Sequence, residues 1–311
     1  MKILVTGATG FVGSCLVRRL VEMSQFEIHI FTRSRSDKWR LADILGQVHS
    51  HDVDLLEAAA VEKAVDQIRP AVICHLATYG GMAHQRETSV IIESNLMGTI
   101  NLVRACEHIK FNCFINTGSS SEYGIKSVPM SESHLPEPVG DYGVSKAAAT
   151  LFCRSRSIEK GLPIVTLRLF SPYGPWDDPR RMIPQVIKSL LRGESPRLST
   201  PEPVRDFIYI DDVLEAYLKV MDSPGSGGEI FNVGTGVQHS VGEVVSVITE
   251  IIGNGAKPGW GMVESHRPEP ECWLADISKS GPGLGWLPNT SLRAGLTKTV
   301  DWFRENIEFY P

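Results

Sequence analysis

The chain has 311 residues, of which 42% are hydrophobic and 22% charged. This composition is typical of globular proteins and excludes collagen-like, coiled-coil and disordered chains. The 31 basic and 36 acidic residues leave a formal net charge of −5, with no long block of either sign. We therefore expect no nucleic-acid partner, because nucleic-acid binding usually needs a basic surface.

The apolar segments are short and interrupted throughout the sequence. No run is long enough for a membrane span, and the glycines near the start of the chain argue against a signal peptide. Six scattered cysteines without a CxxC pair indicate reduced thiols and no structural zinc site. These features predict a soluble, cytoplasmic protein without a membrane partner.

Up to residue 170, strand-length apolar runs alternate with stretches of helical periodicity. The runs are rich in Val and Ile and cover residues 2–6, 28–32, 71–76, 113–117 and 163–169. The helical stretches cover residues 12–23, 55–68, 88–108 and 142–160. This order predicts a doubly wound, mostly parallel α/β sheet with helices on both faces.

The sequence changes in character after residue 170. Pro and Gly cluster in SPYGPWDDP, SPGSGG and GAKPGWG, which indicates longer irregular connections. We expect residues 1–170 to form the sheet domain and residues 171–311 to form a smaller C-terminal α/β lobe. Two further strands, at about 205–210 and 229–233, are candidates to return to the main sheet.

The first predicted strand leads directly into a glycine-rich turn, TGATGFVG, and a helix follows it. Glycines let the backbone turn tightly and approach a pyrophosphate closely, and the exposed N–H groups of the helix then face the anion. The spacing is GxxGxxG rather than GxGxxG, and glycines that merely shape a turn are the alternative interpretation. The residues expected to contact a dinucleotide here are Gly7, Thr9, Gly10, Phe11, Val12 and Gly13.

The end of the second predicted strand carries no acidic residue. Proteins that prefer NAD usually place a carboxylate there to bind the ribose 2′-hydroxyl, and that carboxylate repels a 2′-phosphate. Here Thr32 and Ser34 offer hydroxyls, and Arg33 offers planar donors that suit a phosphate. We therefore predict NADP(H), with NAD(H) as the alternative if Arg33 is only a solvated loop residue. Further contacts are expected near the adenine and the nicotinamide ribose, from Asp52 with Val53 and from Leu76 with Ala77.

Three residues in the middle of the chain suit hydride-transfer chemistry. Tyr142 and Lys146 stand four residues apart at the start of a predicted helix, so both lie on one face. A phenol titrates at about pH 10 in water and needs a neighbouring positive charge to exchange protons at neutral pH. Lys146 supplies that charge, and Ser119, at the carboxyl end of a predicted strand, can hold the substrate oxygen. A surface aromatic beside a solvated lysine is the alternative interpretation.

With these residues in place, the chain resembles the extended short-chain dehydrogenase/reductases that act on nucleotide-diphosphate sugars. The resemblance covers essentially the whole sequence, in the segments TGATGFVG, HLA, SNLMGT, SSSEYG, YGVSK, RLFSPYGP, VRDFIYIDDV, FNVGTG and LGW. It implies a Rossmann fold, a catalytic triad of Ser119, Tyr142 and Lys146, and a cofactor that also contacts Tyr142 and Lys146. It further implies a homodimer whose four-helix interface uses residues 88–108 and 142–160, although apolar residues there also fit packing on the sheet.

The same resemblance implies which residues bind the nucleotide-diphosphate sugar. They are Ser119, Ser120, Ser171, Arg181, Leu198, Arg205 and Arg267. The arginines suit phosphates or ribose because a planar guanidinium can pair through two bonds, and ordinary surface arginines are the alternative. Leu198 lies in the segment expected beside the base, and Ser171 stands where relatives often carry asparagine.

The residues after Ser119 narrow the choice of reaction. Family dehydratases carry an Asp-Glu pair directly after the catalytic hydroxyl, because elimination of water needs an acid and a base. Here these positions are Ser120 and Ser121. Glu122 comes one residue late and would point to the opposite side if the segment were strand-like. A 4,6-dehydratase is therefore disfavoured.

The leading hypothesis is an NADPH-dependent reductase that acts at C4 of a nucleotide-linked 4-keto-6-deoxyhexose in deoxysugar biosynthesis. It depends on the NADP(H) prediction. The first alternative is a 4-epimerase that keeps NAD tightly bound. A module that senses NADP without catalysis is a weaker alternative, because all three catalytic residue types are present.

The segment His49-Ser50-His51-Asp52 is the one cluster that suggests a metal. No HExxH motif or distant ligand accompanies it. We therefore expect a loop after the third strand and no metal site.

Overall fold

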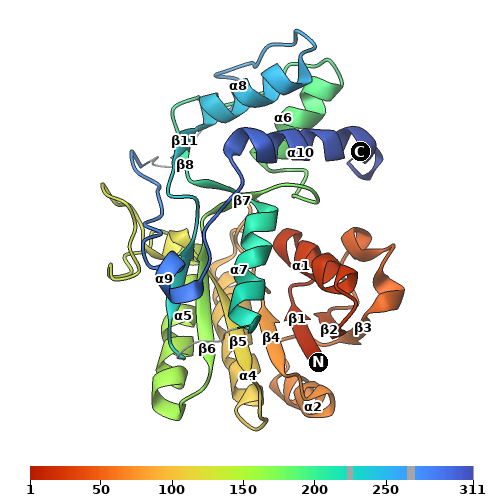
Figure 1. Ribbon diagram of the computed structural model, residues 1–311, viewed down its shortest axis with the longest axis vertical. Coiled ribbons are helices and arrows are strands. Elements are labelled where there is room, and N and C mark those ends of the chain that lie inside the picture. The colour runs from red at the N-terminus through yellow and green to blue at the C-terminus, as the bar shows by residue number, and fades with distance from the viewer. Residues whose placement is uncertain (223–226, 265–269, 311) are drawn as a thin grey trace.

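The computed structural model describes residues 1–222, 227–264 and 270–310. At its centre lies a seven-stranded parallel sheet of order β10-β6-β5-β4-β1-β2-β3, with helices on both faces (Figure 1). Its strands are β1 (Lys2–Thr6), β2 (Glu27–Thr32), β3 (His49–Asp52), β4 (Val72–His75), β5 (Cys113–Ser119), β6 (Ile164–Leu169) and β10 (Ile230–Val233). The predicted doubly wound α/β fold is confirmed, and the central strands are apolar because both of their faces are covered.

Two layers of helices cover the sheet. On one face α1 (Phe11–Glu22) packs beside α7 (Ile210–Asp222). On the other face α2 (Ala58–Ile68), α4 (Gly98–Cys106) and α5 (Asp141–Lys160) pack in sequence. The predicted helix at 88–108 is divided into α3 (Thr88–Ile92), a π-turn at Glu93–Met97 and α4. The wider turn holds Asn95, whose side chain bonds outside its own helix.

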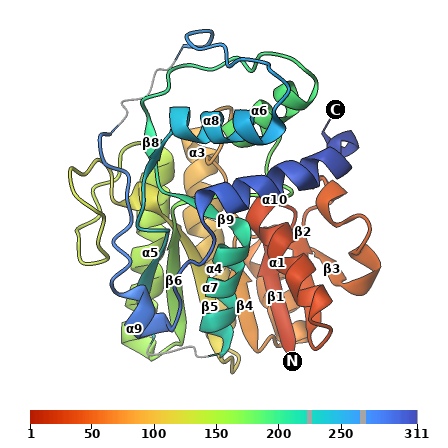
Figure 2. The ribbon, with the colours of Figure 1, turned by 45° about the horizontal axis from the view of Figure 1, so that its top comes forward.

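The second lobe lies over the carboxyl ends of the strands. It contains α6 (Met182–Leu191), α8 (Val241–Ile252) and α10 (Leu292–Glu305), which pack together above the sheet in both views (Figures 1 and 2). Two small sheets join it to the main domain, β7 (Ser171–Tyr173) with β9 (Phe207–Tyr209) and β8 (Val204–Arg205) with β11 (His239–Ser240). The short helix α9 (Ser280–Leu284) lies against β10 and α7 of the main domain.

The two candidate returning strands have different partners. Residues 230–233 form β10, which pairs with β6 at the edge of the main sheet. Residues 207–209 form β9, which pairs with β7. The chain therefore crosses between the lobes after residue 170, and the division at residue 170 stays a prediction.

The expectation of a loop at His49–Asp52 is wrong, because these residues form the edge strand β3. Backbone pairing with β2 holds the strand despite its polar sequence. Its imidazoles pack against His29 of β2: the Nδ1 atom of His29 lies 3.0 Å from Nε2 of His51, and the rings of His29 and His49 stack 4.9 Å apart.

The described residues contain no helix that combines the length and the apolarity of a bilayer span. Within the same residues, no three His, Cys, Asp or Glu side chains are grouped to hold a metal. All six cysteines are free thiols.

Candidate active site

The glycine turn after β1 forms a close-fitting backbone cradle. Gly7 has φ +69°, and a Cβ atom there would lie 2.5 Å from the nitrogen of Ala77. A Cβ at Gly13 would lie 2.2 Å from the carbonyl oxygen of Gly7. Only glycine fits at either position, and the turn ends at Gly10, the N-cap of α1. Since a helix N-terminus offers free N–H groups, this cradle fits the pyrophosphate of a dinucleotide.

Most of the predicted site residues line one cavity of about 510 Å³. They are Gly7, Gly10, Phe11, Val12, Gly13, Leu76, Ser119, Ser120, Tyr142, Ser171, Arg181 and Arg205. A second cavity of about 460 Å³ adjoins it and shares Tyr142 and Arg205. Tyr142 therefore lies where the two cavities meet.

Helix α5 brings Tyr142 to the end of β5 by an unusually close approach. A Cβ atom at Gly143 would lie 2.6 Å from the carbonyl oxygen of Ser121, so the helix can pack this close only with glycine there. The 3₁₀ turn Ser120–Glu122 follows β5 directly, and Ser119 is its N-cap. Lys146 lies one turn beyond Tyr142 and is buried.

The electrostatics of the triad differ from the expectation based on Lys146. Burial raises the pKa of Tyr142 above its ordinary value, and hydrogen bonds with Ser119 and Thr78 oppose that shift. Burial lowers the pKa of Lys146, and the carboxylate of Glu122 opposes the loss of its charge. Desolvation therefore outweighs the expected lowering of the phenol's pKa, because both groups lie inside the protein.

A hydrogen-bonded chain behind Tyr142 was not predicted. The Oγ of Ser145 donates to the carbonyl oxygen of Tyr142 at 2.8 Å, and Nδ2 of Asn95 donates to Oγ of Ser145 at 2.8 Å. The Oγ1 of Thr78 donates to Oδ1 of Asn95 at 3.1 Å. Two features of the sequence could have indicated this hydrogen-bonded chain. Asn95 lies in the SNLMGT segment, and Thr78 directly follows Leu76-Ala77.

The remaining predicted contacts do not line this cavity. They are Thr9, Thr32, Arg33, Ser34, Asp52, Val53, Ala77, Lys146 and Leu198. The hydroxyl of Thr32 is engaged with Oγ of Ser50 at 3.1 Å, and Arg33 and Ser34 are exposed on the turn after β2. Leu198 lines a separate cavity of about 520 Å³ along α6. Arg267 lies outside the described residues.

Three cavity residues that the sequence analysis missed connect the two lobes. The Nη1 of Arg40 donates to the carbonyl oxygen of Thr9 at 3.3 Å, and its Nε donates to that of Trp176 at 2.7 Å. Asp177 follows Trp176, and its carbonyl oxygen accepts a bond from the hydroxyl of Tyr310 at 3.0 Å. The Nε1 of Trp273 donates to Oγ of Ser120 at 3.1 Å. No short motif marks these residues, because each contact joins distant parts of the chain.

Asp177 lines the cavity, and the effect of its buried charge on stability can be measured. Burial raises its pKa to about 6, although Arg181 opposes the shift. A pKa raised on folding favours the folded state fully below the ordinary value of 3.8, and this contribution is lost as the pH rises from there through about 6. Asp177→Asn is therefore expected to raise the melting temperature by about 5 °C at about pH 8 and by about half as much at about pH 5. Thermal unfolding at the two pH values checks this.

Asp178 is the matched control. Burial raises its pKa, but hydrogen bonds from Arg180 outweigh burial and leave the pKa below its ordinary value. Asp178→Asn is therefore expected to lower the melting temperature at about pH 8. Equal gains from Asp177→Asn at both pH values would contradict the assignment of the effect to ionisation.

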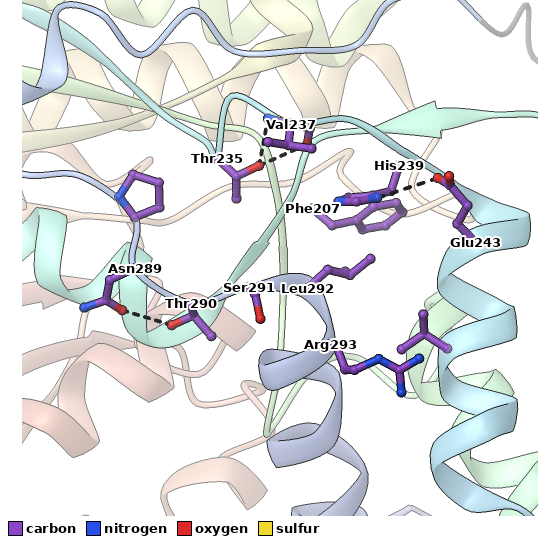
Figure 3. Close-up of a pocket in the computed structure, with 12 residues that line it drawn as sticks. Phe207, Thr235, Val237, His239, Glu243, Asn289, Thr290, Ser291, Leu292 and Arg293 are labelled. Atoms are coloured by element: carbon purple, nitrogen blue, oxygen red, sulfur yellow. Dashed lines mark hydrogen bonds and ion pairs between the residues drawn. The ribbon is translucent and has the colours of Figure 1, made fainter.

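A separate cavity of about 640 Å³ lies between the starts of α8 and α10 (Figure 3). Phe207 and Leu292 form apolar parts of its wall, and Nδ1 of His239 lies 3.6 Å from Oε2 of Glu243. Among the described residues, none of those that line it also lines the cavity that contains the glycine turn. It is therefore not part of the candidate active site.

The sequence pattern of the NAD dependent epimerase/dehydratase family matches residues 3–234 of this chain. The chain belongs to that family. The predicted resemblance to enzymes of nucleotide-sugar chemistry is thus confirmed, as is the prediction of an enzyme of the oxidoreductase/epimerase type.

Similar proteins of this family cover nearly the whole chain. An uncharacterized UDP-glucose epimerase of Bacillus subtilis is 32% identical over 313 residues, which cover 96% of this chain and 97% of the relative. A dTDP-glucose 4,6-dehydratase of Escherichia coli is 26% identical over 342 residues, covering 99% and 94%. The crystal structure of UDP-glucuronic acid 4-epimerase from Bacillus cereus, in complex with UDP-glucuronic acid and NAD, gives a TM-score of 0.87 at 30% identity and covers 98% of this chain and 100% of that one.

Proposed function

We propose that the protein is a 4-epimerase of a UDP-linked sugar. This proposal takes the place of the 4-ketoreductase hypothesis, because similar proteins are named as UDP-sugar 4-epimerases. The observation that carries it is the single cavity in which Ser119 and Tyr142 lie beside the glycine turn. Hydroxyl residues follow Ser119 in place of an acid–base pair.

The proposed chemistry assigns one role to each side chain. Ser119 holds O4 of the sugar, and Tyr142 removes the proton from the 4-hydroxyl and later returns it. A bound nicotinamide supplies the acceptor and the donor of the C4 hydride. The two cavities that meet at Tyr142 offer space for the 4-keto sugar to turn between the two transfers.

The binding roles follow from position and charge. The glycine turn fits the cofactor pyrophosphate, and Lys146 is assigned to the nicotinamide ribose. Arg181 and Arg205 line the cavity and suit the substrate diphosphate. Arg205 also stacks over the ring of Trp273, with its guanidinium carbon 5.2 Å from the ring centre. Arg267 remains a sequence-based candidate for the same diphosphate.

Dehydration is not supported by the contacts around Ser119. Elimination of water needs an acid and a base that reach the sugar. Ser120 accepts a hydrogen bond from Trp273, and Glu122 is fully buried in contacts within the protein. Neither position offers a carboxyl group to the cavity.

A 4-ketoreductase that uses NADPH is the second candidate, and one observation favours it. The turn after β2 exposes Arg33 and Ser34, and no acid occupies the end of that strand. A second observation favours NAD instead. Strand β3 places Asp52 level with Thr32, which brings a carboxylate to the same edge of the sheet. The family is described as NAD dependent, so we take NAD as the cofactor of the proposed epimerase.

We also propose a homodimer through α5 and the α3–α4 segment. Val144, Leu151 and Ile158 are exposed on α5 at intervals of seven residues, so they lie on one face. Met97 is exposed on the neighbouring helical segment. Sedimentation of the purified chain measures this association. The cytoplasm remains the expected compartment.

One incubation series separates the candidate functions. The purified chain is mixed with UDP-glucose, UDP-galactose, UDP-glucuronic acid or UDP-galacturonic acid without added cofactor, and the products are resolved by chromatography. We expect interconversion of one C4 pair and release of NAD, not NADP, when the protein is denatured. No turnover of these sugars, together with stoichiometric NADPH oxidation by a 4-keto-6-deoxy sugar nucleotide, would establish the reductase instead.

A further inference from the structure

A buried ion pair lies behind Ser119, outside the cavity. Glu122 is 0% exposed and Arg168 is 1% exposed, and Nε of Arg168 donates to Oε2 of Glu122 at 2.8 Å. The other carboxylate oxygen, Oε1, accepts from the backbone nitrogen of Ser119 at 2.8 Å and from Oγ1 of Thr150 at 3.1 Å. This one carboxylate therefore joins β5, β6 and α5 at the candidate active site.

We propose that Glu122 is a positioning residue that fixes Ser119 against α5 and supplies the counter-charge for the buried Lys146. The proposal rests on the proposed function, in which Ser119 and Lys146 serve the same site. Glu122 itself does not line either cavity at Tyr142. It acts through the residues that it holds.

The backbone around Ser119 directs the carboxylate of Glu122 toward it. Glu122 would point away from Ser119 if the segment were strand-like, but residues Ser120–Glu122 form a 3₁₀ turn. The turn carries the carboxylate back beneath Ser119, whose own Oγ accepts from the nitrogen of Ser121 at 3.1 Å. A Cβ atom at Gly118 would lie 2.6 Å from Oε1 of Glu122, so the absence of a side chain there makes room for the carboxylate.

Glu122 also acts through its charge. A buried ammonium group is costly unless an opposite charge lies near it. Burial lowers the pKa of Lys146, and Glu122 is the largest influence that raises it. Thr150, which donates to Glu122, lies one turn beyond Lys146 on the same helix. Glu122 therefore serves as the counter-charge of two cations, Arg168 and Lys146.

The effect of removing this negative charge has a definite sign. The titratable groups that face Glu122 are Arg168 on β6, Tyr123 next to the 3₁₀ turn, and Tyr142, Lys146 and Cys153 on α5. Glu122 raises the pKa of both Tyr142 and Lys146. Burial places the pKa values of Tyr123 and Cys153 at about 12, and arginine stays protonated. Of these groups, Tyr142 and Lys146 belong to the proposed catalytic triad, so we expect loss of the charge of Glu122 to lower both of their pKa values and to move the pH profile to lower pH.

The test uses three variants of the full-length chain. Glu122→Gln removes the charge but leaves Arg168 buried without an opposite charge, which can prevent folding. The double variant Glu122→Gln with Arg168→Met removes both members of the pair and keeps the test usable. Glu122→Asp keeps the charge and shortens its reach. Circular dichroism and thermal unfolding establish which variants are folded.

The first readout is the pH dependence of kcat for epimerisation. In folded Glu122→Gln, we expect the profile to move by about one unit to lower pH, with kcat lowered about 10- to 100-fold and KM nearly unchanged. The double variant is expected to move it in the same direction by less, because it also removes the positive charge of Arg168. Glu122→Asp is expected to restore the position of the profile but only part of kcat. A purely structural role would lower stability and kcat without moving the profile, and that result would overturn the proposal.

The second readout is the pH dependence of NADH binding, followed by fluorescence without substrate. The alkaline limit of binding is expected to move to lower pH in the charge-removing variants, because Lys146 loses its proton more readily. If the unmodified chain shows no epimerase activity, the proposed function fails and this binding profile alone decides the role of Glu122. An unmoved binding profile overturns the proposal for Glu122 even if the unmodified chain is an active epimerase.

Discussion

Tyr142→Phe is expected to lower kcat for C4 epimerisation by about 10³-fold, because the variant has no group that can exchange a proton with O4. Affinity for NADH is expected to change less than about threefold, since the ring keeps its packing. The hydroxyl removed is the one that Ser119 and Thr78 contact. Turnover of the UDP-sugar and fluorescence titration with NADH measure the two effects separately.

Tyr173→Phe is the matched control for this change. Tyr173 is also buried, and its hydroxyl donates to the carbonyl oxygen of Leu292 at 3.3 Å, away from the catalytic cavity. Its loss is expected to reduce stability by about 1 kcal/mol and to leave turnover intact. If Tyr142→Phe retained more than about a tenth of the turnover, Tyr142 would not be the acid–base residue.

Gly7→Ala is expected to abolish cofactor binding and to cost about 3 kcal/mol or more of stability. Two causes add together at this position. The backbone has φ +69°, which disfavours a side chain, and the added Cβ would lie 2.5 Å from the backbone of Leu76 and Ala77. Relief of that overlap would displace β1 from β4 at the place where the pyrophosphate is expected. Thermal unfolding and NADH titration check both parts.

Gly193→Ala is the control that separates the effect of a positive φ from the effect of the steric overlap of the added Cβ atom. Gly193 has φ +75°, but a Cβ atom there would have no heavy atom within 4 Å. We expect a loss of about 1 kcal/mol from the backbone conformation and unchanged NADH affinity. Equal losses in the two variants would mean that the cradle tolerates a methyl group, and the cofactor assignment would then lack its geometric basis.

Sequence reasoning succeeded where one local cause decides the structure. Apolar runs gave the central strands because both of their faces are buried. The glycine turn was recognisable because only glycine permits such close backbone contacts. Tyr142 and Lys146 are related by helical spacing alone.

Prediction from the sequence failed where contacts between distant parts of the chain decide the structure. The polar residues of β3 show no apolar alternation, yet pairing with β2 makes them a strand. The position of Glu122 depends on a 3₁₀ turn and on Arg168, 46 residues further along. The direction of the pKa shift of Tyr142 follows from its burial, which the spacing to Lys146 does not reveal.

Arg40 donates to the carbonyl oxygen of Trp176, and Tyr310 donates to that of the next residue, Asp177. These contacts affect the order in which the protein folds during synthesis. Arg40 and Asp177 both line the cavity, and Tyr310, which is not among the lining residues, supports Asp177 through this hydrogen bond. A growing chain on the ribosome can therefore fold most of its sheet early, but the support of this wall is incomplete until residue 310 has emerged. Capture of the coenzyme should accordingly come after the synthesis of residue 310.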